Sequence, residues 1–304
     1  MPPMETYDVI IIGGGPAGLN AALILGRCRR RVVVIDAGRP RNAAAQHAHG
    51  FLTRDGVPPL DILALGRKEL LTYGVEFRAA VVTRVRPGVR RMTVTLRGGA
   101  RLAARKLLLA TGVLDELPRV PGVEELYGTS VHHCPYCDGW ENRDRPLAVY
   151  GPPEEASGLA MSLLTWSRDL VVCTDGRRLS AKAGARLTNA RVEARTERIV
   201  RLEGTRGRLE RIVFARGPVL ERYGLFFNTG QAQRSPLAER LGCQFTKSGH
   251  VRCDRKGNTG VPNLFMAGDA NGDTQFVVVA AAEGAKAAVA INKELQDEDR
   301  RASL

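Results

Sequence analysis

Residues 7–18 read YDVIIIGGGPAG, an apolar run that ends in three consecutive glycines. The continuous apolar run indicates a buried strand, and residues 17–27 after the glycines have the apolar spacing of a helix. Residues 31–35 form a second apolar run that ends at Asp36. Strand, glycine turn, helix and strand make a β–α–β unit of about 30 residues, the setting in which a glycine-rich turn binds a dinucleotide.

Each glycine of this turn has its own physical role. Gly13 permits the tight turn, Gly15 lets a pyrophosphate approach the backbone, and Gly18 lets the helix pack on the strand. The pyrophosphate is expected at the positive end of the helix dipole. Asp36 lies 18 residues after Gly18, where its carboxylate can accept hydrogen bonds from ribose hydroxyls. The alternative, a glycine-rich turn without a ligand, is disfavoured because strand, helix and acid occur in the right order.

A second unit of the same kind is predicted from residue 146 onward. Residues 147–150 and 170–173 have the composition of buried strands, and a helix is expected over 154–167. The repeat suggests an internal duplication, so we predict an α/β fold with two Rossmann-like dinucleotide-binding domains. The other expected elements are helices over 60–73 and 276–295, strands within 75–96 and over 107–110, and a β-hairpin from 191–202 and 209–214.

The chain carries 45 basic and 32 acidic residues, a net charge of +13, and the excess is concentrated towards the N-terminus. Residues 1–115 hold 18 basic and 8 acidic residues, whereas residues 245–304 hold 8 of each. This distribution fits either a basic face that attracts an acidic protein or an anionic cofactor, or solvated arginine-rich surfaces. The basic stretches contain no interleaved aromatic residues, so nucleic-acid binding is disfavoured.

The lengths of the apolar runs and the number of cysteines limit the class of protein further. No apolar run reaches the length of a membrane span and no basic–apolar leader is found, so we expect no membrane association and a cytoplasmic location. Six cysteines in a chain of this length do not indicate a disulfide scaffold, and Cys28, Cys173, Cys243 and Cys253 are expected to be reduced. Cys243, His250 and Cys253 lack a fourth ligand at zinc-site spacing, so no metal site is expected.

The stretch HHCPYCDG contains two cysteines, Cys134 and Cys137, separated by two residues. Such a pair can be a dithiol or a disulfide: one thiolate attacks an external disulfide and the other resolves the mixed disulfide. His132, His133 and Asp138 are the residues that can activate a thiol or carry its proton. The alternatives are half of a zinc site, which lacks its second pair, and two structural thiols. Each histidine taken singly is equally consistent with an ordinary loop residue.

Near the C-terminus, Gly268 and Asp269 follow an apolar segment and precede a helix expected to begin near Gln275. A carboxylate after a strand can hold a polyol chain, and free amides at a helix start can polarise a carbonyl or an anionic ring. Because Gly-Asp is also an ordinary turn, the pair is a weak indication by itself.

Taken in order, these motifs resemble the low-molecular-weight thioredoxin reductase family of flavoproteins, within the pyridine nucleotide-disulfide oxidoreductases. The resemblance covers nearly the whole chain and includes Ala110-Thr111-Gly112, Thr229-Gly230 and Ala267-Gly268-Asp269. It implies that residues 1–115 and 245–304 form one discontinuous FAD-binding domain of three layers, in which a parallel sheet lies between helices and a β-meander. Residues 116–244 would form an inserted NAD(P)H-type domain that carries the cysteines.

The resemblance also implies roles for individual residues. Cys137 would face the flavin and exchange electrons with it, and Cys134 would attack the external disulfide. Asp138 would manage the proton, and His133 completes the candidate catalytic set. Asp269 would hold the ribitol and Asp36 the adenosine ribose, while Gln275 would lie beside the isoalloxazine ring. The candidate FAD-binding residues are Gly13, Gly15, Pro16, Ala17, Gly18, Asp36, Ala37, Asn42, Ala110, Thr111, Gly112, Gly268, Asp269, Gln275 and Phe276.

Two departures from the family pattern bear on the electron donor. Where the family's NADPH loop reads Gly-x-Gly-x-x-Ala/Gly, this chain has GPPEEA at residues 151–156. Pro153 replaces the middle glycine and removes a backbone N–H, while Glu154 and Glu155 place negative charge where phosphates would arrive. The family's His-Arg-Arg after the next strand is only partly matched by TDGRR at residues 174–178. NADPH is therefore predicted to bind weakly or not at all.

The second departure lies between the cysteines, where Pro135 and Tyr136 stand in place of the small residues common in the family. This stretch resembles the dithiol oxidases of natural-product pathways, flavoproteins of the same fold that pass substrate electrons to oxygen. Tyr136 is equally explained as a packing residue.

The leading hypothesis is an FAD-dependent thiol–disulfide oxidoreductase acting on a thioredoxin-like protein or a small dithiol or disulfide. An acidic protein such as ferredoxin is a candidate electron donor, and an oxygen-dependent dithiol oxidase is the alternative within the class. From other classes, a non-catalytic redox-sensing flavoprotein and an NAD-dependent dehydrogenase stay open, although the latter leaves Cys134 and Cys137 without a role. A homodimer is implied by the resemblance alone.

Overall fold

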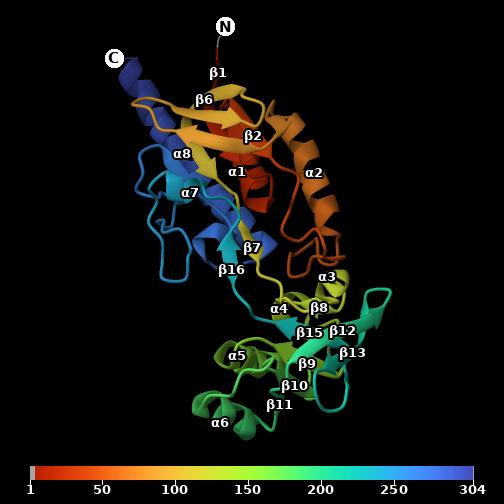
Figure 1. Ribbon diagram of the computed structural model, residues 1–304. Helices are drawn as coiled ribbons and strands as arrows, with labels where there is room; N and C mark the ends of the chain where they lie inside the picture. Colours follow the sequence, from red (N-terminus) through yellow and green to blue (C-terminus); the bar gives the residue numbers. More distant parts are fainter. Residues whose placement is uncertain (1–3, 304) are drawn as a thin grey trace. The chain divides into compact units, whose positions relative to one another are not determined.

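The computed structural model describes residues 4–303, which divide into two compact units (Figure 1). The first unit comprises the chain up to Ala43, Gly50–Leu114, and the chain from Ala232 onward. The second comprises Ala44–His49 and Asp115–Gln231. The chain passes between the units on either side of Ala44–His49 and again in two short strands, β7 (Val113–Asp115) and β16 (Gln231–Gln233).

The expected boundary after residue 244 is wrong, because residues 232–244 belong to the first unit. They contain helix α7 (Leu237–Arg240), whose Leu237 and Ala238 are buried, together with Leu241, in the hydrophobic core of that unit. Burial of these apolar side chains in the first unit, and not their position in the sequence, decides to which unit the segment belongs. The short segment Ala44–His49 lies with the second unit, which the sequence also did not predict.

A seven-stranded sheet forms the centre of the first unit, in the order β3-β2-β1-β6-β5-β4 with β17 also paired to β6. The strands β3, β2, β1, β6 and β17 pair in parallel, whereas β4, β5 and the first half of β6 form an antiparallel meander. The strand bounds are β1 Glu5–Ile12, β2 Val32–Asp36, β3 Glu76–Ala79, β4 Val82–Arg86, β5 Met92–Leu96, β6 Arg101–Leu109 and β17 Leu264–Met266. The helices are α1 Pro16–Arg27, α2 Pro59–Leu71, α7, the 3-10 turn η1 Asp269–Asn271 and α8 Val277–Ala302.

Strand β1 is buried on both faces, as its continuous apolar run predicts. Val9 and Ile11 pack in one cluster with residues of α1 and α8, while Ile10 and Ile12 pack in a second cluster with the meander and α7. Since successive side chains of a strand point to opposite faces, one apolar run serves both layers. The three-layer arrangement predicted for this domain is confirmed.

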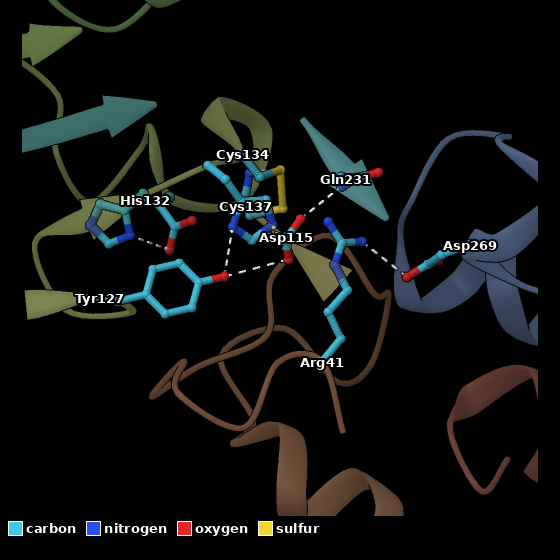
Figure 2. The surroundings of a disulfide bond; sticks show 10 residues. Arg41, Asp115, Tyr127, His132, Cys134, Cys137, Gln231 and Asp269 are labelled. Atoms are coloured by element: carbon cyan, nitrogen blue, oxygen red, sulfur yellow. Dashed lines mark hydrogen bonds and ion pairs between the residues drawn. A yellow bond between two sulfur atoms is a disulfide. The ribbon is translucent and has the colours of Figure 1, made fainter. Parts of the chain in front are cut away.

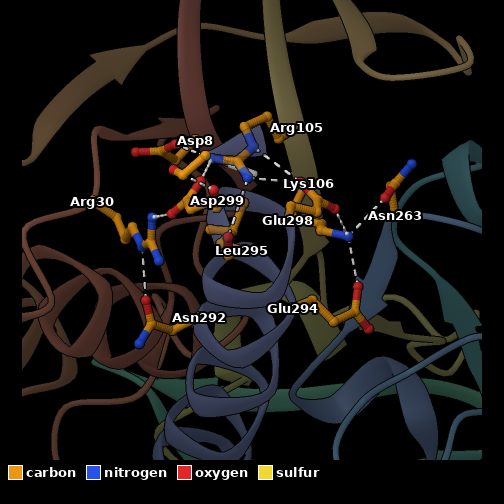
Figure 3. Close-up of polar contacts among 11 residues, drawn as sticks. Asp8, Arg30, Arg105, Lys106, Asn263, Asn292, Glu294, Leu295, Glu298 and Asp299 are labelled. Carbon is orange, nitrogen blue, oxygen red and sulfur yellow. Dashed lines mark hydrogen bonds and ion pairs between the residues drawn. The ribbon is translucent and has the colours of Figure 1, made fainter. Parts of the chain in front are cut away.

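The long helix α8 is fixed to the sheet at its C-terminal end by ion pairs (Figure 3). Lys106 of β6 is only 3% exposed, and its Nζ lies 2.6 Å from Glu294 Oε2, 2.8 Å from Glu298 Oε1 and 2.8 Å from Asn263 Oδ1. The neighbouring Arg105 donates to Glu298 from Nε and Nη2 at 3.0 and 2.8 Å. A buried ammonium with three acceptors is satisfied, so the network ties α8 to β6 without leaving an unpaired charge.

The second unit repeats the layered plan. Its five strands pair in parallel in the order β11-β10-β9-β15-β8, and a three-stranded antiparallel sheet, β12-β13-β14, covers one face. Helices α5 and α6 cover the other face. The bounds are β8 Val131–His132, β9 Leu147–Tyr150, β10 Leu170–Cys173, β11 Glu193–Arg195, β12 Ile199–Thr205, β13 Arg208–Phe214, β14 Leu220–Glu221, β15 Gly224–Phe227, α3 Val123–Leu126, α4 Pro135–Asp138, α5 Pro153–Leu163 and α6 Ala181–Ala190. The predicted duplication is thus visible in both units.

The predicted hairpin is correct in kind but wrong in its first part. β12 and β13 pair antiparallel, whereas Glu193–Arg195 forms β11 and pairs in parallel with β10. This polar segment pairs with the edge of the parallel sheet through backbone hydrogen bonds. Its side chains therefore gave no sign that it would form a strand.

Two further findings concern membranes and metals. Across residues 4–303, no helix has both the length and the apolar character of a membrane span. In the same part of the chain, no three His, Cys, Asp or Glu side chains are grouped as metal ligands, and this includes Cys243, His250 and Cys253.

Candidate active site

The glycine turn in the first unit has the geometry of a dinucleotide cradle. A Cβ on Gly13, which has φ +112°, would collide with the carbonyl oxygen of Ala110, and one on Gly18 would collide with the carbonyl oxygen of Gly13. In contrast, a Cβ on Gly15 would meet no atom within 4 Å. Gly13 and Gly18 therefore serve the fold, while Gly15 borders open space at the start of α1. Pro16 and Ala17 begin that helix, and no side chain caps it.

Asp36 ends β2 and is already hydrogen-bonded to the turn. Its Oδ2 accepts the Gly14 N–H at 2.6 Å, its Oδ1 accepts the Gly38 N–H at 2.7 Å, and Arg67 Nη2 lies 3.7 Å from Oδ1. These contacts fix the carboxylate beside the cradle and leave it further acceptor sites, since an ionised carboxylate has about four. The adjacent Ala37 is exposed, and the more distant Asn42 is half-buried in a turn.

A second wall of the cradle comes from the C-terminal part of the chain. The Gly268 N–H donates to Glu283 Oε2 at 2.7 Å, and burial raises the pKa of Glu283. Asp269 Oδ2 lies 3.0 Å from Arg41 Nη1, so the predicted polyol-binding carboxylate is paired with a cation that the sequence did not single out. A lone arginine in a loop carries no spacing signal by which it could have been found.

Four more predicted residues lie at strand and helix ends of this unit. The Ala110 N–H donates to the Ile12 carbonyl at 2.8 Å, which holds the segment after β6 against β1. Gly112 has φ +66°, a conformation that favours glycine. Phe276 is the N-cap residue of α8, whose N-terminus no side chain caps, and Gln275 precedes it.

In the second unit, Cys134 and Cys137 form a disulfide with their Cα atoms 5.3 Å apart (Figure 2). Cys134 is the N-cap of the short helix α4, and its sulfur accepts the Cys137 N–H at 3.2 Å. Pro135 is the first residue of that helix, so it occupies the one position where a missing N–H costs nothing. Both cysteines are half-buried, so the disulfide does not lie in the hydrophobic core.

One predicted histidine lies beside the predicted acid. His132 Nδ1 is 3.3 Å from Asp138 Oδ1, and the side chain of His132 is 5% exposed. Asn142, a residue the sequence did not point to, lies 3.4 Å from His132 Nε2 and donates to the Asp138 carbonyl at 2.8 Å. These contacts join the end of α4 and the segment after it to β8, the strand before the helix.

The other histidine belongs to a separate polar group. His133 Nδ1 lies 3.1 Å from the Tyr127 hydroxyl, and His133 Nε2 lies 3.8 Å from Asp115 Oδ2. Gln231 Nε2 donates to Asp115 Oδ1 at 2.8 Å, so this group includes residues of β7 and β16 (Figure 2). His133 is thus close to Cys134 in sequence but is held by residues that sequence reasoning missed.

The residues between the cysteines also matter for access. Tyr136 is 70% exposed and makes an edge contact with Trp166, their ring centroids 5.5 Å apart. Trp140 is 63% exposed and stacks under Arg143. Tyr136 is therefore not a core packing residue, and aromatic surface lies next to the disulfide.

The second glycine turn, between β9 and α5, differs from the first. Gly151 has φ +154°, Pro153 is the first residue of α5, and Glu154 and Glu155 occupy the first turn of that helix. The Glu154 carboxylate accepts a hydrogen bond from Ser180. At the end of β10, Asp175 Oδ2 accepts from the Tyr150 hydroxyl at 3.0 Å and Oδ1 from the Ile199 N–H at 2.8 Å. Burial and Asp175 together raise the pKa of Tyr150 to about 12.

Comparison with known proteins places these features in a family. The family described as pyridine nucleotide-disulphide oxidoreductase matches residues 7–284. The chain belongs to this family. This oxidoreductase is 32% identical, over 337 residues, to a probable thioredoxin reductase of Arthroderma benhamiae, with 99% of this chain and 83% of the relative covered.

Two solved structures are similar over almost the full length of this oxidoreductase. A putative thioredoxin reductase, TrxB, from Bacillus anthracis matches with a TM-score of 0.90 at 36% identity, covering 96% of this chain and 99% of that one. The crystal structure of HlmI matches with a TM-score of 0.94 at 39% identity, covering 98% and 95%. The oxidoreductase is therefore thioredoxin reductase-like, with a two-domain Rossmann-like fold, and it is an enzyme acting on sulfur groups.

Proposed function

We propose that this protein is an FAD-dependent thiol–disulfide oxidoreductase that moves two electrons between FAD and the Cys134–Cys137 disulfide. The observation that carries the proposal is the half-buried disulfide at the start of α4, with Asp138 in the same helix, in a chain that also has a dinucleotide cradle. The disulfide and the cradle are best explained together. An enzyme that only binds a dinucleotide does not need the disulfide, and a purely structural disulfide does not need the cradle.

The residues of the first unit fit FAD. The open space at Gly15 and the uncapped start of α1 suit a pyrophosphate, and Asp36 at the end of β2 suits a ribose. Asp269 and Gln275 would hold the ribitol and the ring. When bound, the flavin supplies a two-electron acceptor or donor for the cysteine pair.

The chain's own residues perform the thiol chemistry. An external thiol loses its proton and attacks Cys134 Sγ, the bond to Cys137 breaks, and Cys137 leaves as a thiolate that takes up a proton. The second external thiol then loses its proton and attacks the substrate sulfur of the mixed disulfide, releasing Cys134. Two electrons and two protons pass from the dithiol to the cysteine pair. Asp138 is the side chain that carries the first proton between the incoming and the leaving sulfur.

The second glycine turn supports the prediction that NADPH is a poor donor. Pro153 removes one N–H from the helix start where a pyrophosphate would bind, and the carboxylates of Glu154 and Glu155 lie in that same turn. Asp175, held by Tyr150 and the Ile199 N–H, adds negative charge at the strand end that would receive the ribose. These observations favour a second candidate function, an oxidase in which a small dithiol is oxidised and oxygen is reduced to peroxide.

The decisive experiment is an anaerobic titration of the purified protein followed by its visible spectrum. We expect a bound flavin that is bleached by dithiothreitol and only slowly by NADPH at micromolar concentration. The Cys134→Ser variant is expected to keep its flavin and to lose bleaching by the dithiol. A colourless protein that takes up no FAD contradicts the proposal, as does a Cys134→Ser variant bleached at the wild-type rate.

Admission of air then separates the two candidate functions. Peroxide formed in step with oxidised dithiol indicates the oxidase, whereas turnover that needs a thioredoxin-like protein or reduced ferredoxin indicates a reductase. Slow turnover with every donor, together with disulfide-dependent partner binding, indicates a redox sensor. Sedimentation of the same sample measures whether the protein is the homodimer that we propose.

A further inference from the structure

His132 lies in β8 with its imidazole buried and fully engaged. Its ring packs on Phe226 of the adjacent strand β15, with the centroids 5.2 Å apart, and only 5% of the side chain is exposed. Burying an imidazole is costly unless both nitrogens have partners. The two partners are Asp138 in α4 and Asn142 shortly after it, so every polar contact of this ring is directed to the segment that carries the cysteines.

The hydrogen-bond donors fix which nitrogen of His132 carries the proton. The Asn142 amide nitrogen donates one hydrogen to the Asp138 carbonyl at 2.8 Å, which also fixes the orientation of the amide. Its other hydrogen is directed to His132 Nε2 at 3.4 Å, and because an amide nitrogen only donates, Nε2 must accept. The neutral ring therefore has its hydrogen on Nδ1, 3.3 Å from Asp138 Oδ1.

We propose that His132 is a positioning residue, which holds the Asp138 carboxylate as the proton carrier of the Cys134–Cys137 pair. This inference rests on the proposed function. Asn142 donates to His132 Nε2, and the Nδ1 side of the ring faces Asp138 Oδ1 in an ion-pair contact of 3.3 Å. Oδ1 of the carboxylate is thereby held beside the ring, and Oδ2 is the oxygen that takes the sulfur-bound proton. In the exchange step, Asp138 accepts that proton from the incoming thiol and returns it to the leaving Cys137 sulfur.

The competing explanation is a histidine that merely fills the core between β8 and α4. The two explanations differ in what a replacement must preserve. An asparagine at 132 has an amide N–H near the position of Nδ1, whereas a glutamine has its amide near Nε2. A core role is sensitive to volume and stability, but a positioning role requires the donor to Asp138.

The test measures how fast dithiothreitol reduces the Cys134–Cys137 disulfide, by acid quench, alkylation and mass spectrometry, so that no flavin signal is needed. We expect His132→Gln to slow exchange about tenfold, equivalent to ~1.4 kcal/mol for a lost hydrogen bond to a charged group. His132→Asn should stay within about twofold of the wild type. Ser130→Ala is the matched control, because Ser130 is a buried polar residue of the segment before β8 whose hydroxyl bonds Gly207 and Leu209 instead.

The following outcomes decide the matter. The proposal is supported if His132→Gln exchanges slowly while His132→Asn and Ser130→Ala exchange at close to the wild-type rate. It is overturned if His132→Gln exchanges at the wild-type rate. It is also overturned if His132→Gln and His132→Asn are slowed equally. Asp138→Asn exchanging at the wild-type rate also overturns it. Should the variants fail to fold, ¹⁵N spectra of histidine in the wild type still decide, since an Nε2–H tautomer contradicts the hydrogen-bond chain. A wild-type disulfide that exchanges rapidly in a protein without flavin would defeat the proposed function while leaving His132 in its role.

Discussion

Replacing Gly15 by alanine separates cofactor binding from folding. Gly15 has φ −78° and ψ −176°, which any residue adopts, and its added Cβ would meet no atom within 4 Å. At a helix N-cap the change from glycine to alanine costs roughly 0.5 to 1 kcal/mol of folding free energy. The new methyl group points into the space where the pyrophosphate is expected, and loss of one hydrogen bond to a charged group weakens binding by about 10- to 100-fold.

Gly18→Ala is the comparison variant. Its Cβ would collide with the carbonyl oxygen of Gly13 and lie 3.3 Å from Ile11 Cγ2, so we expect a loss of roughly 1 to 3 kcal/mol in folding free energy. The two free energies are measured by urea unfolding of the flavin-free proteins, and FAD affinity by quenching of flavin fluorescence. If the Gly15 variant binds FAD as tightly as the wild type, the pyrophosphate does not lie on this turn. If both variants are equally unstable, the assignment of Gly15 to binding is wrong.

Three further predictions address stability and thiol reactivity. Lys106→Met should lower the free energy of unfolding by about 2 kcal/mol, less than for a fully buried ion pair because its carboxylate partners are partly hydrated. Urea unfolding checks this. Burial acts to raise the pKa of Glu298, but hydrogen bonds from Lys106 and Arg105 outweigh burial and lower that pKa. The ionised Glu298 therefore stabilises the fold above about pH 4.5, and this stabilisation is lost as the pH falls through the lower pKa of the folded state. The urea midpoint of Glu298→Gln should accordingly fall less than that of the wild type between about pH 5 and about pH 3. At about pH 8, iodoacetamide should modify Cys28, which is exposed, and spare Cys253, whose pKa burial raises to about 11, as peptide mass mapping of the native protein will show.

Much of the fold is readable from residues with strong local patterns. The apolar strands β1, β2, β9 and β10 are buried on both faces, and a run of Val, Ile and Leu between glycine turns has few other structures available. Gly13 and Gly18 were predictable for the same reason, since strand, turn and helix geometry requires glycine at those positions. Asp36 was predictable because the dinucleotide-binding motif has an acid at the end of the second strand.

The missed elements have weak or misleading side chains. Helix α6 (Ala181–Ala190) buries only Ala183 and Leu187, so it lacks a broad apolar stripe, although its Ser180 cap was a signal that could have been used. β11 is polar and owes its conformation to a neighbouring strand. The unit boundary was missed because burial of Leu237 depends on tertiary packing, which sequence order does not reveal.

The same limit applies to the candidate site. Cys134, Cys137 and Asp138 were found because chemistry requires them within a few residues of one another. Tyr127, Asp115 and Gln231 contact His133 or each other from three separate segments, and no spacing rule connects them. Arg41 and Asp269 are 228 residues apart in the chain.

The split layout of the first unit has a consequence for synthesis. Its last sheet strand, β17, pairs with β6, and a Cβ on Gly284 of α8 would collide with the Ala17 carbonyl of α1, so segments that lie before and after the second unit in the sequence pack tightly together. The ribosome synthesises the whole second unit before it has made β17 or α8 of the first unit. In a nascent chain the first unit therefore stays incomplete after the second unit has emerged, and a chain that stops before Leu264 lacks both β17 and α8 of the first unit.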